Sequence, residues 1–264
     1  MTKRRCRAPP ITPPISPVSN RKIIINRDLA DLSRRAAEHF VALARQAIAA
    51  RGRFSVALSG GYTPKALYTL LASSEYNERL PWRQIHLFWG DERCVTPDHA
   101  DSNYRMVKES LLSKAIIPTE NVHRMAGEKA PAVAAAEYEA QLRKHFHIDD
   151  KSLPRFDLVL LGLGEDGHTA SLFPGSSALD ETRRLVVTTY VKKLKAHRLT
   201  LTFPVINNSE QIAFLVAGES KAAMVGEILT TEKCDYAAAR IKPENGQLIW
   251  FVTQDAASVV TNSI

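Results

Sequence analysis

Segments typical of β-strands alternate with segments typical of α-helices along most of this chain, and the alternation limits the folds open to it. Between residues 28 and 50, apolar side chains recur at helical spacing, and a short apolar run of strand length follows at 54–58 (FSVAL). Some of the strand-like runs, such as 156–161 (FDLVLL), are apolar at nearly every position, as in strands buried on both faces. We therefore expect an α/β fold, Rossmann-like in layout, with helices on both faces of a mainly parallel sheet.

The predicted elements continue in this pattern to the end of the chain. The predicted strands are 22–26, 54–58, 84–89, 156–161, 185–191, 199–203, 211–217 and 248–252. The predicted helices are 28–50, 64–71, 102–112, 132–146 and 219–229. Because no repeat and no linker interrupts residues 22–264, we expect them to form a single domain whose ligands bind at the carboxyl ends of the strands.

Residues 1–21 differ from the rest in being basic and rich in proline. The formal charge of the chain is +7, and the first 22 residues carry six cations and no acid, which leaves +1 for the remainder. We expect a disordered tail before a nearly neutral domain, and no nucleic-acid partner for that domain. No apolar run is long enough to span a membrane, and three scattered cysteines favour a reducing compartment, so a cytoplasmic protein is expected.

No motif predicts a metal or a cofactor. The chain has no Cys-x-x-Cys, and its eight histidines form no His-Glu-x-x-His. Residues 162–167 (GLGEDG) satisfy the dinucleotide pattern G-x-G-x-x-G, but Pro174 interrupts the helix that should follow. The next predicted strand also ends without the acid that binds a ribose. We expect neither a dinucleotide nor a metal.

Three of the strands lead into unusual loops. The first loop, 58–64 (LSGGYTP), places Ser59, Gly60, Gly61 and Thr63 at the start of a helix, an arrangement that suits a phosphate. An ordinary tight turn before a capped helix is the alternative. The second loop, 89–95 (WGDERCV), brings three charged residues directly after an apolar strand. Its Arg93 is suited to bind a carboxylate or phosphate, although a solvated surface turn is the commoner explanation.

The third loop, 162–176, carries the most chemical information. Asp166 and His168 place a carboxylate and an imidazole two residues apart between glycines, as in a general base with an orienting partner. A lone structural histidine is the alternative. Two further cations, Arg198 before a strand and Lys221 in the first turn of a helix, give mild support to an anionic ligand, although a solvated lysine is the commoner explanation.

Taken together and in this order, the segments resemble those of the 6-phosphogluconolactonases, relatives of glucosamine-6-phosphate isomerase/deaminase. The resemblance covers roughly residues 22–257 and rests on LSGGYTP, WGDERCVTPDHADSNYRM, GLGEDGHTASLFPGS and HRLTLTFPVIN. It implies a parallel-sheet domain with a small antiparallel addition. It also implies metal-free hydrolysis of 6-phospho-D-glucono-1,5-lactone to 6-phosphogluconate in the oxidative pentose phosphate pathway, by a monomer or weak homo-oligomer.

The resemblance also implies roles for particular residues. His168 would be the general base that activates water, with Asp166 beside it and Arg93 binding or polarising the substrate. The substrate and its phosphate would be bound by the remaining residues: Ser59, Gly60, Gly61, Thr63, Asp91, Arg198 and Lys221.

Two other functions are compatible with parts of the pattern. The related isomerase/deaminases carry a glutamate five residues after the histidine, but Phe173 stands there in this chain. A non-catalytic sugar-phosphate sensor would need a DNA-binding domain, and the first 20 residues are too short and too rich in proline for a helix-turn-helix. The lactonase reaction therefore remains the expected one.

Overall fold

The computed structural model describes residues 21–231 and 234–261. The predicted tail lies outside these residues except for Arg21, which pairs with Leu248 and so belongs to the first strand. The strands are β1 (Arg21–Asn26), β2 (Phe54–Leu58), β3 (Ile85–Trp89), β4 (Asp91–Arg93), β5 (Val122–His123), β6 (Leu158–Leu161), β7 (Val186–Val191), β8 (Ala196–Leu201), β9 (Gln211–Val216) and β10 (Gln247–Thr253). The helices are α1 (Leu29–Arg51), α2 (Tyr62–Leu71), α3 (Ser74–Asn77), α4 (Asn103–Val107), α5 (Pro131–Phe146), α6 (Phe203–Asn207), α7 (Ala222–Thr230) and α8 (Ser258–Thr261).

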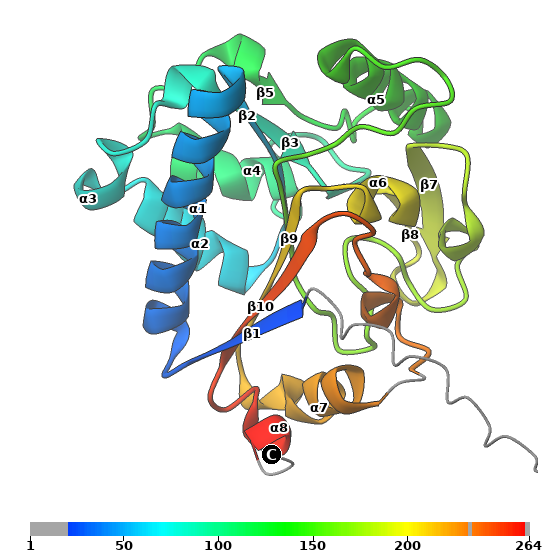
Figure 1. Ribbon diagram of the computed structural model, residues 1–264. Helices are drawn as coiled ribbons and strands as arrows, with labels where there is room; N and C mark the ends of the chain where they lie inside the picture. Colours follow the sequence, from blue (N-terminus) through cyan, green and yellow to red (C-terminus); the bar gives the residue numbers. More distant parts are fainter. Residues whose placement is uncertain (1–20, 232–233, 262–264) are drawn as a thin grey trace, which may run out of the picture.

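Seven strands form one parallel sheet in the order β1-β10-β9-β6-β2-β3-β5, as the apolar runs predict. The central strands β2 and β6 are buried along their whole length, because helices and the smaller sheet cover both faces. In Figure 1, α1 and α2 lie on one side of the sheet, while α5 and α6 lie on the other beside β7 and β8. The α/β fold class is confirmed.

The second sheet is small and antiparallel, with the order β4-β8-β7. Its strand β4 is the segment Asp91–Arg93, which the sequence predicts as a loop. Here it pairs with β8, Arg93 opposite Arg198, because the chain turns at Gly90 and continues in an extended conformation. The antiparallel addition that the resemblance implies is therefore present.

The ends of several elements differ from the predictions for local reasons. The predicted strand 199–203 begins earlier, at Ala196, and stops at Leu201, because Pro204 lies in the first turn of α6. Ser102 caps α4 as predicted, with its side chain accepting a hydrogen bond from the Arg105 N–H. Lys221 lies in a 3-10 turn (Glu219–Lys221) that leads into α7. Within the described ranges, no helix has the length and apolar character needed to cross a membrane.

Candidate active site

A cavity of about 940 Å³ opens where β2, β6 and β9 end, beside the small antiparallel sheet. Parallel strands bring the loops that follow them to one edge of the sheet, so segments far apart in the sequence meet here. All the residues predicted for the site line this cavity: Ser59, Gly60, Gly61, Thr63, Asp91, Arg93, Asp166, His168, Arg198 and Lys221. The structure thus brings the whole predicted set together, while the role of each residue stays a prediction.

The turn after β2 exposes the start of helix α2 to the cavity. Gly61 has φ +101°, a conformation that side chains rarely adopt, and its carbonyl accepts the first helical bond from the Lys65 N–H at 3.1 Å. The N–H groups at the very start of the helix have no carbonyl partner within it. Together with the helix dipole, they make this turn suitable for an anion.

Tyr68, which the sequence analysis did not single out, fixes the same turn. Its buried hydroxyl accepts from the Ser59 N–H at 3.0 Å and donates to the Ser59 carbonyl at 2.9 Å. Burial raises the pKa of this phenol, so it stays neutral. The N–H and carbonyl of Ser59 are therefore bonded within the protein, and its hydroxyl donates to the Gly60 carbonyl at 3.2 Å. The spacing of Tyr68 on one face of α2 is an ordinary core spacing and gave no signal of this contact.

Asp91 and Glu92 are both buried, and their carboxylates accept hydrogen bonds from other segments of the protein. Ser171 Oγ donates to Asp91 Oδ2 at 2.6 Å, which ties β4 to the loop that carries His168. Glu92 accepts from the main-chain N–H groups of Asn103 and Tyr104, both at 2.7 Å. Burial raises the pKa of Glu92, and these hydrogen bonds act against that rise. The carboxylates of Asp91 and Glu92 thus help to fix the position of the segment 89–95.

Asp166 and His168 form a hydrogen-bonded pair on the wall of the cavity. His168 Nδ1 bonds to Asp166 Oδ1, and the same oxygen accepts from the His168 main-chain N–H at 3.2 Å. Burial raises the pKa of Asp166, but the hydrogen bond and charge of His168 outweigh it and leave that pKa lower than usual. The carboxylate is therefore ionised near neutral pH, and it leaves Nε2 as the nitrogen free to act on a substrate.

The imidazole of His168 is held from both sides. Phe173 stacks on it with ring centroids 4.0 Å apart and an interplanar angle of 27°. On the backbone side, a Cβ at Gly164 would lie 2.1 Å from the ring, so only glycine fits there. Phe173 is the residue at the position where the isomerase/deaminases carry glutamate, and in this chain it packs against the histidine.

Cations outnumber acids around the cavity. Arg93 and Arg198 lie opposite each other across β4 and β8, and within residues 21–231 and 234–261 neither forms a salt bridge. Burial and the neighbouring Arg93 lower the pKa of Arg198, as expected for two unneutralised guanidinium groups close together. Lys221 lines the cavity near the end of β9, and Lys192 and Lys193, which the sequence analysis missed, line it after β7. The cavity is thus suited to an anionic ligand.

Comparison with known proteins identifies the family. Residues 27–250 match the family of glucosamine-6-phosphate isomerases/6-phosphogluconolactonase. The chain belongs to this family. A family member from Synechocystis sp., named 6-phosphogluconolactonase, is 43% identical over 249 residues, which are 93% of this chain and 98% of the relative.

Solved structures of the family show the same fold. The 6-phosphogluconolactonase from Trypanosoma cruzi has a TM-score of 0.80 and 30% identity, with 91% of this chain and 97% of that chain covered. A monomeric glucosamine-6-phosphate deaminase has a TM-score of 0.73 and covers 90% of this chain and 99% of its own, at 22% identity, which shows the shared fold alone.

Proposed function

We propose that this chain hydrolyses 6-phospho-D-glucono-1,5-lactone to 6-phosphogluconate, the lactonase step of the oxidative pentose phosphate pathway. The observation that carries the proposal is the Asp166–His168 pair facing a cavity rich in cations. Membership in a family whose relatives bear the name 6-phosphogluconolactonase supports it. The substrate is an anion with an electrophilic carbonyl, which matches a base beside anion-binding groups.

The phosphate is proposed to bind at the start of α2. There the glycine turn supplies N–H groups and Thr63 a hydroxyl, and Lys221 lines the same cavity. Arg198 adds a guanidinium that forms no salt bridge within the described chain. Anchoring the phosphate holds the lactone ring in one orientation against the opposite wall, and this lowers the entropic cost of the reaction.

The chemical step is proposed to use His168 as the general base. Nε2 takes a proton from water, and the hydroxide formed attacks C1 of the lactone. Arg93 stabilises the negative charge that develops on the carbonyl oxygen. When the bond between C1 and the ring oxygen breaks, the imidazolium returns its proton to that oxygen, and Asp166 stabilises the imidazolium meanwhile.

Phe173 favours hydrolysis over isomerisation. A sugar-phosphate isomerase needs an acid or base that moves protons along the substrate, and the related enzymes use glutamate at this position. Phe173 has no ionisable group, and its ring is occupied in stacking on His168. The protein is therefore proposed to keep the imidazole as its single proton-transfer group.

The test is hydrolysis of freshly prepared lactone, coupled to 6-phosphogluconate dehydrogenase and corrected for spontaneous hydrolysis. His168→Ala is expected to lower kcat by about 10²–10⁴-fold, the usual contribution of a general base. His39→Gln is the matched control, because His39 is also half-buried but lies on α1 and does not line the cavity. Absence of turnover in the wild-type protein overturns the proposed function, and full activity in His168→Ala overturns the assignment of the base.

A further inference from the structure

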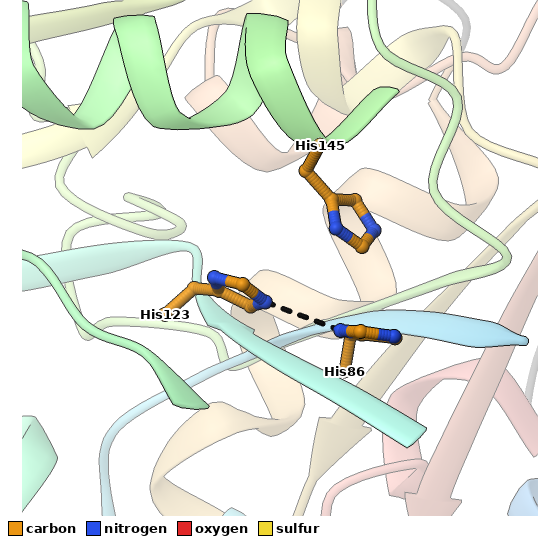
Figure 2. A group of neighbouring side chains, drawn as sticks. All are labelled: His86, His123 and His145. Carbon is orange, nitrogen blue, oxygen red and sulfur yellow. Dashed lines mark hydrogen bonds between the residues drawn. The ribbon is translucent and has the colours of Figure 1, made fainter. Parts of the chain in front are cut away.

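Three histidines from separate elements meet outside the cavity described above. His86 lies on β3, His123 on β5 and His145 in the last turn of α5 (Figure 2). One nitrogen from each ring lies within 4.8 Å of the others. None of the three lines the cavity of the proposed lactonase site.

The spacing of the first two rings is already that of metal ligands. His86 Nδ1 and His123 Nε2 point at each other at 3.2 Å (Figure 2). A tetrahedral Zn²⁺ bound at 2.0–2.1 Å by imidazole nitrogens keeps two such nitrogens about 3.3 Å apart. The distance thus fits two ligands of one ion, and the rings have to turn so that their lone pairs converge on it. His145, whose ligand nitrogen lies within 4.8 Å of the other two, moves closer to join them.

The protein also supplies the outer contacts that hold metal-binding imidazoles in place. The side-chain amide of Gln141 lies beside His123 Nδ1, the nitrogen that faces away from His86, with the amide nitrogen at 3.2 Å. When this amide turns by about 180°, its oxygen accepts from Nδ1–H, and the lone pair of Nε2 becomes available to a metal. Ser55 Oγ lies 2.9 Å from His145 Nε2. Bonds of this kind fix the tautomer and the orientation of a ligating ring.

The surroundings keep the rings neutral and reachable. Burial and the charge of His86 lower the pKa of His123 to about 4, and burial with the neighbouring histidines lowers the pKa of His145 to about 3. Neutral imidazole is the form that binds metals. All three residues are only half-buried, so an ion can enter from solvent.

We propose that His86, His123 and His145 form a binding site for one divalent transition-metal ion of the Zn²⁺ type, with water at the fourth position. Three imidazoles with an open position suit Zn²⁺, Co²⁺ or Ni²⁺ rather than Mg²⁺ or Ca²⁺, which prefer oxygen ligands. The ion joins two strands at the edge of the sheet to the end of α5. No sequence motif predicts the site, because its ligands lie in three separate segments of the chain.

Zinc binding is measured on the tag-free, full-length protein by isothermal titration and by thermal unfolding with and without ZnCl₂. The wild-type protein and His39→Gln are expected to bind one ion at this site and to melt at a higher temperature with zinc. His123→Gln and His145→Gln are each expected to weaken this binding by at least about 100-fold, and Gln141→Ala by about 10-fold. Metal-free melting curves of each variant report whether it is folded.

A further variant and a diffraction measurement locate the ion. His168 lies beside the carboxylate of Asp166, so this pair is another place where zinc could bind. His168→Ala is expected to retain zinc binding at the three-histidine site. Crystals of the wild-type protein soaked in ZnCl₂ are expected to give an anomalous peak between the three rings. Equal zinc affinity in the wild type and both His→Gln variants, loss of binding in His168→Ala alone, or no anomalous peak between the rings would each overturn the proposal.

Discussion

The histidine of the proposed active site and the three histidines of the proposed metal site differ in what lies beside them. His168 has an ionised carboxylate on one nitrogen and a phenyl ring on its face, so a proton arriving at the other nitrogen meets a charge that stabilises it. His86, His123 and His145 have one another, Phe88 and neutral hydrogen-bond partners. Protonation of any one of them is opposed by burial and by its neighbours. The first setting suits proton transfer, and the second suits donation of a lone pair.

Among the changes that leave His168 itself in place, the largest effect should come from removing the charge beside it. Asp166→Asn keeps the size of the side chain but loses the negative charge, so kcat for lactone hydrolysis is expected to fall by about 10²-fold with KM nearly unchanged. Steady-state kinetics in the coupled assay give both constants. A rise in KM with unchanged kcat would mean that Asp166 binds substrate instead of supporting the base.

Anion binding in the cavity that contains His168 is tested by a substitution of Arg198. Arg198→Ala removes one guanidinium of the facing pair, and KM is expected to rise by about 10- to 100-fold, the value of a charge-assisted hydrogen bond. The expected effect on kcat is smaller, since the guanidinium is proposed to bind the phosphate and not the reacting carbon. A decrease in kcat with unchanged KM would contradict phosphate binding by Arg198 and would indicate a role in the chemical step.

The three-histidine cluster is tested by replacing His123 with an apolar residue. Its ring already stacks on Phe88, with centroids 4.2 Å apart and an interplanar angle of 12°. His123→Phe keeps that packing and removes a half-buried polar ring, so the free energy of unfolding without metal is expected to stay the same or rise by about 1 kcal/mol. Urea denaturation measures it. Destabilisation by several kcal/mol would show that the hydrogen bonds of His123 matter more than its packing.

The smallest effect concerns His39, a histidine with neither a carboxylate nor a second imidazole. Burial lowers its pKa, although a hydrogen bond to Gln211 acts against this. The unfolded chain therefore binds more protons than the folded one below about pH 6.5, and stability falls as the pH falls. His39→Gln should remove this part of the loss, at most about 1 kcal/mol between pH 7.5 and 5.5. Parallel urea titrations of both proteins at the two pH values measure the difference.

Sequence reasoning succeeded where a single local rule decides the structure. Continuous apolar runs predict buried parallel strands, and parallel strands bring the loops after β2 and β6 to one edge, so Ser59 and His168 were expected together. The segment Asp91–Arg93 was wrongly predicted as a loop, because a strand of three residues gains its stability from the pairing with β8 and not from its own composition.

Contacts between distant segments could not be predicted either, because local composition does not determine them. The bond from Ser171 to Asp91 and the packing of His145 near His86 depend on how the loops and α5 are placed on the sheet. No spacing along the chain encodes either of them. Lys192 and Lys193 carried a weak signal, as two cations directly after a predicted strand, but such pairs are common on surfaces.

The order of the strands has a consequence for how the protein is made. Among the described strands, β1 pairs only with β10, so β1 leaves the ribosome about 220 residues before its partner does. At about 5–20 residues per second, the wait is on the order of 10–40 seconds. During that time Ile23, Ile24 and Ile25 have no sheet to join. This edge of the sheet therefore closes only after β10 has been made, and until then a chaperone that binds extended apolar segments has a target in β1.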